Sequence, residues 1–169
     1  MLFRSLAGNE TTTNLIGNGT LALMRHPAEL ARLRRDPALL PRAIEEMLRY
    51  DPPAQSTIRV TKTDATIGGV AIKKDSAVFV VLAAINRDPA QFPDPERFDI
   101  TRDPNDHLAF GDSIHFCLGA ALARLEAMIV FGAMFARFPQ LRLADPAAEV
   151  QYKGSYFLRG LAALRLAIV

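Results

Sequence analysis

The chain has 169 residues, half of them hydrophobic, a formal net charge of +2 and a single cysteine. This composition suffices for one compact core, and the near-neutral charge argues against a nucleic-acid partner. Because no apolar stretch can span a bilayer, no signal peptide opens the chain and one cysteine suits a reducing compartment, we predict a cytoplasmic protein without membrane association.

Helical patterns fill the first third of the chain. Apolar residues predict a first helix over residues 3–24 that opens without a capping sequence. We therefore expect the chain to start inside a helix, with an apolar surface that a missing segment would cover. Two further helices are predicted over 27–34 and 38–50, and prolines follow both of them.

The residue pattern then changes to that of strands. Alternation predicts strands over 56–61 and 65–72, the second of them folded into a hairpin at Gly68-Gly69. An apolar run predicts a buried strand over 77–81. The chain from its start to this point is thus mostly helical with a small antiparallel sheet.

The remaining sequence contains one long helix. A short helix over 82–86 precedes an irregular, proline-rich segment over 87–106. A long apolar helix is predicted over 118–138. Closing strands are predicted over three short segments: 141–143, 150–152 and 164–169.

The only cysteine precedes this long helix, in Phe110-Gly111-Asp112-Ser113-Ile114-His115-Phe116-Cys117-Leu118-Gly119. It is a buried inert thiol, a nucleophile or a metal ligand, because a lone cysteine forms no intrachain disulfide. Unpaired N–H groups and the helix dipole favour an ionised thiolate at a helix start. The glycines at 111 and 119 leave room for a large flat group near the sulfur.

Three other patterns have an ordinary interpretation when they are considered alone. Ala7-Gly8-Asn9-Glu10-Thr11 interrupts the first helix with poor helix formers, or else supplies a helix N-cap. Glu46 and Arg49 lie on one helix face, as in many surface ion pairs. Arg59 is read as an exposed strand arginine, and His115 as a histidine in a turn.

Together these motifs resemble the cytochrome P-450 superfamily of haem-thiolate monooxygenases. The family's cysteine loop reads Phe-Gly-x-Gly-x-His-x-Cys-x-Gly, and this chain matches it at Phe110, Gly111, His115, Cys117 and Gly119. The chain departs from the pattern at Ser113, where the family usually has glycine. If that position requires a positive φ, the serine strains the loop by about 1 kcal/mol or more.

The resemblance implies a role for each motif. Cys117 would be the iron ligand, and the other matched loop residues would help to hold the haem. Arg59 and His115 would contact its propionates, since arginine suits a carboxylate. Gly8 would open a groove for dioxygen, Thr11 would hydrogen-bond the iron-bound oxygen and Glu10 would deliver protons.

The resemblance also implies structural elements behind the cysteine loop. Glu46 and Arg49 would form a buried triad with Arg97, and Asn86-Arg87-Asp88-Pro89 would be a fold element. Residues 53–57 and 155–157 would line the substrate pocket, although Tyr156 and Phe157 also suit a plain core. His26 and His107 lack ligand spacing with the cysteine, which argues against a zinc site.

The implied fold is mainly α with small antiparallel β-sheets, the C-terminal portion of the cytochrome P-450 fold. Residues 1–169 would form a single partial domain whose N-terminal half is absent. The implied function is to insert one oxygen atom from dioxygen into a small organic substrate at haem b, with electrons from NAD(P)H through a ferredoxin or flavoprotein. Either a complementing N-terminal half completes this enzyme, or the chain is a truncated, non-catalytic fragment that binds haem weakly or not at all.

Overall fold

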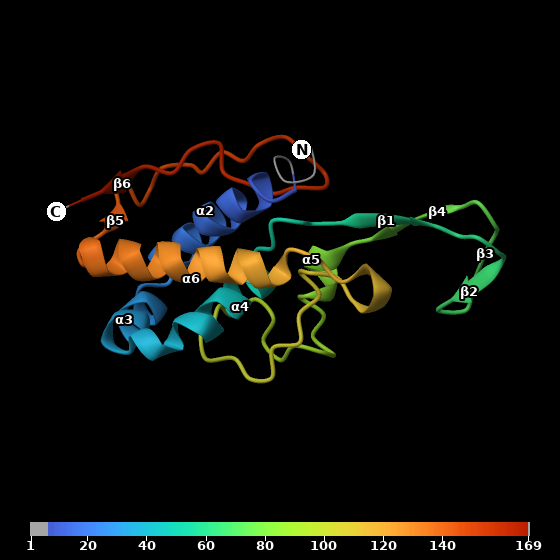
Figure 1. Cartoon of the computed structure of the whole chain (residues 1–169), viewed down its shortest axis with the longest axis horizontal. Helices are drawn as coiled ribbons and strands as arrows, with labels where there is room; N and C mark the ends of the chain where they lie inside the picture. The colour runs from blue at the N-terminus through green and yellow to red at the C-terminus, as the bar shows by residue number, and fades with distance from the viewer. Residues whose placement is uncertain (1–6, 169) are drawn as a thin grey trace.

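The helices and strands of the computed structural model, which describes residues 7–168, follow the predicted order (Figure 1). The helices are α2 (Glu10–Arg25), α3 (Pro27–Arg35), η1 (Pro37–Leu39), α4 (Leu40–Tyr50), α5 (Leu82–Ile85), η2 (Ser113–His115) and α6 (Ala120–Arg137). The strands are β1 (Thr57–Val60), β2 (Ala65–Ile67), β3 (Val70–Ile72), β4 (Ala77–Val80), β5 (Arg142–Leu143) and β6 (Leu166–Ala167). The predicted class, mainly α with small antiparallel sheets, is confirmed.

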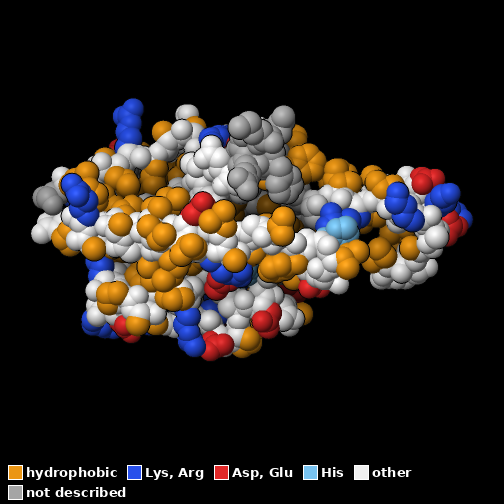
Figure 2. All heavy atoms as spheres, viewed as in Figure 1, with side chains coloured by type: hydrophobic (Ala, Val, Ile, Leu, Met, Phe, Trp, Pro, Cys, Tyr) orange, Lys and Arg blue, Asp and Glu red, His pale blue; other side chains and the backbone are white. Residues whose placement is uncertain are grey.

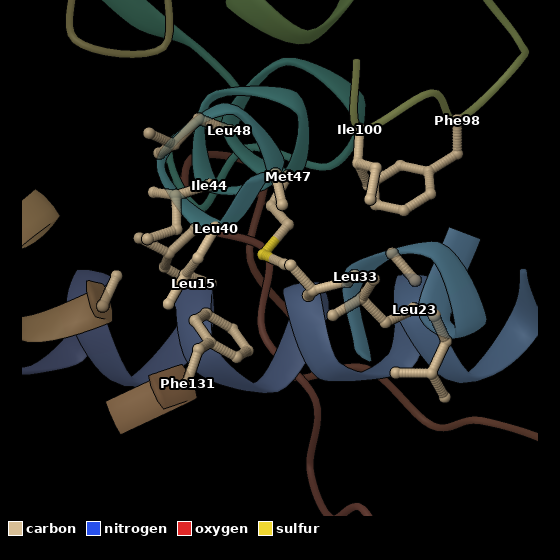
Figure 3. Close-up of a cluster of buried hydrophobic side chains, with 14 of the residues drawn as sticks. Leu15, Leu23, Leu33, Leu40, Ile44, Met47, Leu48, Phe98, Ile100 and Phe131 are labelled. Atoms are coloured by element: carbon tan, nitrogen blue, oxygen red, sulfur yellow. The ribbon is translucent and has the colours of Figure 1, made fainter. Parts of the chain in front are cut away.

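The core lies where α2, α4 and α6 pack together. Leu40, Ile44 and Met47 recur at helical spacing along α4 and are buried. Ile44 and Met47 converge with Leu15 of α2 and Phe131 of α6 (Figure 3). This packing fixes α6, and therefore the position of the cysteine loop that precedes it.

Gly19 of α2 packs closely against side chains of α4 and α6. A Cβ atom there would lie 2.6 Å from Sδ of Met47 and 3.0 Å from Cζ of Phe131. We expect Gly19→Ala to lower the free energy of unfolding by about 1–3 kcal/mol in urea denaturation, because overpacking strains a close-packed core. Gly17→Ala is the matched control, since its Cβ would meet Leu161 at 3.6 Å. An equal effect of both substitutions would contradict this account.

The small sheets differ from the prediction in burial. Strand β1 pairs antiparallel with β4, and β2 pairs with β3 across the predicted Gly68-Gly69 turn. The predicted buried strand at 77–81 is wrong in that Phe79 is 59% exposed and Val81 47% exposed. A two-stranded ribbon projecting from the helices has no second layer to cover its faces (Figure 1).

The closing strands are shorter than predicted. Strands β5 and β6 pair antiparallel, with Arg142 opposite Ala167. The predicted strand at 150–152 is reduced to one isolated bridge between Tyr152 and Leu161. The chain around this bridge runs along α2 (Figure 1) and packs Leu161 toward Gly17.

The exposed apolar surface lies on a different helix from the one predicted. No large hydrophobic side chain of the described part of the first helix is exposed, and buried leucines of this helix pack in the core with α4 and α6; residues 3–6 lie outside the described part. On α6, by contrast, Leu122, Leu125 and Ile129 are 56%, 56% and 62% exposed. Hydrophobic side chains gather along this helix in Figure 2. Within residues 7–168, no helix has the length and hydropathy needed to cross a membrane.

Candidate functional site

Cys117 lies at the start of α6, as predicted. Gly119 occupies the N-cap position, and the Cys117 side chain is exposed. The Cys117 N–H donates to the carbonyl of Phe110 at 2.8 Å, which closes the loop back on itself. A Cβ atom at position 119 would lie 3.9 Å from Sγ of Cys117. Gly119 therefore lies beside the sulfur, where an added Cβ atom would make an ordinary van der Waals contact.

The turn before the cysteine adopts the conformation that the sequence comparison suggested. Ser113 has a φ of 54° and Gly111 a φ of 73°. An L side chain rarely adopts this region, so the serine strains the loop by about 1–3 kcal/mol. At Gly111 a Cβ atom would also approach the His115 carbonyl oxygen at 3.2 Å.

The Gly8-to-Thr11 motif lies at the start of α2 rather than in the middle of a helix. Residues 7–9 form a turn and the helix begins at Glu10. Asn9 occupies the N-cap position, as the alternative interpretation had it, although its side chain makes no capping hydrogen bond. The Thr11 hydroxyl donates to the Ala7 carbonyl at 2.6 Å. Glu10 is half-buried and lies 4.0 Å from Nζ of Lys153.

Glu46 and Arg49 form a buried ion pair, and both side chains are 0% exposed. Nε of Arg49 donates to Glu46 at 2.7 Å and Nη2 donates to it at 2.8 Å. Glu46 also accepts from the N–H of Asp99 at 2.9 Å. Each of the three guanidinium nitrogens of Arg49 donates to an acceptor, and these hydrogen bonds offset the cost of burying the charged pair.

The predicted third member of this cluster is wrong. The Arg97 side chain is 61% exposed and pairs with Asp99, while its carbonyl accepts from Arg49 at 3.1 Å. Arg102, only 10% exposed, instead lies 3.3 Å from Glu46. Only four residues lie between the two arginines, and the path of the irregular segment decides which of them faces inward.

Asn86 connects this buried pair to the chain before the cysteine loop. Its side chain is 0% exposed, and its carbonyl accepts from Nη1 of Arg49 at 3.0 Å. Its Oδ1 accepts from the Leu108 N–H at 2.8 Å. The Asn86-Arg87-Asp88-Pro89 segment is therefore a fold element, as the sequence comparison implied.

A second charged cluster beside the loop was not predicted. Arg124 of α6 donates to Glu45 of α4 from Nε at 2.7 Å and from Nη2 at 2.8 Å. His107 Nε2 lies 3.1 Å from the same carboxylate. The guanidinium of Arg124 lies 4.6 Å from the centre of the Phe110 ring. No sequence spacing pointed to this contact, because Glu45 and Arg124 are far apart in the chain.

This cluster predicts a pH effect. Burial raises the pKa of Glu45, but hydrogen bonds and charges from Arg124 and His107 outweigh burial and lower it from 4.5 to about 2. The stabilisation is therefore complete above pH 4.5 and is lost as the pH falls toward 2. We expect Glu45→Gln to cost on the order of 1 kcal/mol at pH 6 and to cost much less near pH 2, since the pair is partly exposed.

Urea denaturation of both proteins at several pH values between 6 and 2 measures this effect. Glu149→Gln is the control, since that carboxylate is exposed. Parallel stability curves for the Glu45→Gln variant and the unsubstituted chain would contradict the assignment.

The two residues predicted to contact the propionates differ in burial and in hydrogen bonding. Arg59 on β1 is half-buried, and its Nη1 donates to Thr57 Oγ1 at 2.8 Å and to the Ile58 carbonyl at 2.9 Å. His115 is exposed at the end of η2. Within residues 7–168 no hydrogen bond links Arg59 to the cysteine loop. In Figure 1, β1 and the N-terminal ends of α2 and α6 lie toward the same end of the helical body.

The two segments predicted to line a pocket do come together. The Gln55 N–H donates to the Phe157 carbonyl at 2.8 Å, and a hollow of about 630 Å³ includes Ser56, Ser155 and Tyr156 in its lining. Tyr156 is 93% exposed and Phe157 is 42% exposed. The alternative that these aromatic residues are plain core is therefore wrong.

Within the described chain, no group of three or more His, Cys, Asp and Glu side chains is arranged to hold a metal ion.

Comparison with known proteins gives the family. The Cytochrome P450 family model matches residues 4–149. The chain therefore belongs to the cytochrome P450 family.

Individual relatives show how much of the family fold this chain spans. It is 51% identical over 156 residues to 6-deoxyerythronolide B hydroxylase of Saccharopolyspora erythraea, covering 92% of this chain and 39% of that protein. It is 50% identical over 157 residues to vitamin D(3) 25-hydroxylase of Pseudonocardia autotrophica, covering 92% of this chain and 39% of that protein.

A solved structure agrees with these relatives. P450BioI, in complex with an acyl carrier protein ligated to hexadec-9Z-enoic acid, superposes with a TM-score of 0.94 at 46% identity. The match covers 98% of this chain and 42% of that one. The chain thus spans about two fifths of the length of these relatives.

Proposed function

We propose that this chain supplies the cysteine side of a haem-thiolate monooxygenase, with Cys117 as the iron ligand. One observation carries the proposal: the only cysteine is exposed at the start of a helix, in a loop that matches the family at five positions. The relatives' names, hydroxylases among them, favour an enzyme over a non-catalytic fragment. Residues 1–169 would act as one partial domain, the C-terminal haem-binding half.

The residues around the sulfur fit haem b. The thiolate is a soft ligand that suits iron, and Gly119 leaves space beside it. Ile114, Phe116 and Leu118 are 93%, 53% and 89% exposed, so an apolar macrocycle would remove apolar surface from water. We assign the haem propionates to Arg59 and His115, and the close loop contacts to Phe110 and Gly111.

Bound haem would supply the activation of dioxygen, with electron density pushed from the thiolate. The chain's own part would be to hold the sulfur, to keep water away from it and to deliver protons. We assign proton delivery to Glu10 and Thr11, with Gly8 leaving space beside them. Glu10 is half-buried near Lys153 and thus in contact with solvent, as a group that passes protons inward requires.

The partners follow from the family and from the length of the relatives. We propose a small organic substrate and a ferredoxin or flavoprotein that transfers electrons from NAD(P)H. We also propose a complementing N-terminal half, since this chain covers 39% of the length of these two relatives. This half would cover the exposed apolar face of α6, which includes Leu122, Leu125 and Ile129.

The test is the absorption spectrum of the haem-reconstituted chain, reduced and bound to carbon monoxide. A thiolate-type Soret band would support the proposal and justify screens for substrate and donor. A band typical of a protonated thiol would overturn the proposal that this chain alone holds the iron through a thiolate. Restoration of the thiolate band by a separately expressed N-terminal half would then support complementation.

The proton-delivery assignment has its own test. In an active form, Thr11→Ala should raise the share of electrons released as hydrogen peroxide by about tenfold, because proton delivery contributes factors of that size or more. Thr13→Ala is the matched control, since its exposed hydroxyl donates to the Asn9 carbonyl at 2.8 Å in the same way. Equal peroxide release by both variants would remove Thr11 from the mechanism.

A further inference from the structure

The side chain of Phe110 is held by a charged neighbour. The guanidinium of Arg124 lies 4.6 Å from the centre of its ring. The rings of Phe116 and His107 also lie near it, each with its centroid 6.3 Å away. A guanidinium on an aromatic face is attracted by the ring quadrupole and restricts where the ring lies. The position of Phe110 is therefore coupled to that of Arg124.

Arg124 is itself held in place by a bidentate contact with Glu45, at 2.7 and 2.8 Å. His107 fixes the same carboxylate, because its Nδ1 accepts from the Ala109 N–H at 3.2 Å. In neutral imidazole the proton is then on Nε2, which donates to Glu45 at 3.1 Å. The cluster thus ties α4, the chain before the loop and α6 together.

The contact reaches the sulfur through one backbone hydrogen bond. The Cys117 N–H donates to the Phe110 carbonyl at 2.8 Å. A shift of Phe110 therefore moves the backbone that carries the sulfur. Arg124 is also coupled to this part of the chain by charge. The hydrogen bond to Glu45 is the main cause that raises the pKa of Arg124. Burial lowers this pKa, and the charges of Glu45 and Cys117 raise it further.

We infer that Arg124, anchored by Glu45, is a positioning residue for the iron-ligating cysteine. It holds the Phe110 ring, and through the Phe110 carbonyl it orients the Cys117 backbone so that the sulfur stays exposed on one side. The consequence for haem rests on the proposed function, whereas the contact between Arg124 and the loop does not.

Amide hydrogen exchange in the haem-free chain tests the contact directly. Arg124→Gln and Phe110→Leu should each raise the exchange rate of the Cys117 amide about tenfold, because both release the carbonyl that protects it. The double variant should exchange no faster than the faster single variant, since both substitutions break one path. Arg137→Gln is the control, because Arg137 lies 5.8 Å from the Phe138 ring at the other end of α6.

The exchange rates of Met47 and Phe131 amides in the core should stay unchanged in every variant, which separates a local effect from unfolding. If Arg124→Gln does not fold, Arg124→Lys keeps the charge but loses the bidentate fork, and it should raise the Cys117 rate by a smaller factor. A Cys117 rate equal to that of the Arg137→Gln control, or additive rates in the double variant, would overturn the inference.

The haem-reconstituted chain gives a spectroscopic signature that a merely structural residue would not change. Reduced and bound to carbon monoxide, Arg124→Gln should lower the proportion of haem that shows the thiolate-type band, because the loop that orients the sulfur is released, and Arg124→Lys should restore most of it. An unchanged proportion would overturn the link to the sulfur. If the unsubstituted chain shows no thiolate band, the proposed function fails, whereas amide exchange still decides the role of Arg124.

Discussion

Replacing Cys117 with alanine is expected to abolish thiolate ligation of haem. The chain has no second cysteine, so no other residue can supply a thiolate. The measurement is the Soret band of the reduced, carbon-monoxide-bound chain, which should fall to background at the thiolate position. Because Cys117 is exposed, the free energy of unfolding should change by no more than about 0.5 kcal/mol.

A second substitution separates loss of the ligand from loss of the site. Cys117→His offers the iron an imidazole at the same position and should retain haem with a nitrogen-ligand spectrum. Retention of a thiolate-type band in Cys117→Ala would remove this cysteine from the metal site and with it the central proposal.

Breaking the buried Glu46–Arg49 pair is expected to have the largest effect on stability. Either Glu46→Ala or Arg49→Ala leaves an uncompensated charge where both side chains are 0% exposed, at a cost of about 3–5 kcal/mol. A domain with a total stability of about 5–15 kcal/mol would lose much of it. Urea denaturation followed by far-UV circular dichroism measures the change.

The arginines of the irregular segment are the matched controls. Arg102→Ala should cost more than Arg97→Ala, because Arg102 is 10% exposed against Glu46 whereas Arg97 is 61% exposed. For Arg97→Ala we expect no more than about 1 kcal/mol, as for other surface pairs. The reverse order would favour Arg97 as the third member of the cluster, as the sequence predicted, and would contradict the role of Arg102.

Motifs that are local in the chain were predicted well from sequence. The cysteine loop is contiguous, so its position before α6 follows from the pattern of one helix and the residues that precede it. The positive φ of Ser113 meets the condition under which the sequence indicated strain in the loop. The Glu46–Arg49 pair is local too, because three residues on a helix bring two side chains together.

The charged contacts between distant segments were not predicted from the sequence. Arg97 and Arg102 both lie in an irregular segment, where no period indicates which side chain faces the core. Glu45 and Arg124 meet only because α4 and α6 pack together. The exposed apolar face lies on α6, whereas no large hydrophobic side chain of the described part of α2 is exposed.

The sequence by itself determined the family, the order of helices and strands and the residue that we propose binds iron, because each of these depends on short contiguous patterns. Only the tertiary structure decided that Arg102 completes the buried cluster and that Arg124 holds Phe110. It also decided that the β1–β4 ribbon is exposed. The physical reason is that burial and charge pairing depend on which segments pack together, and helix packing brings together residues that no local spacing connects.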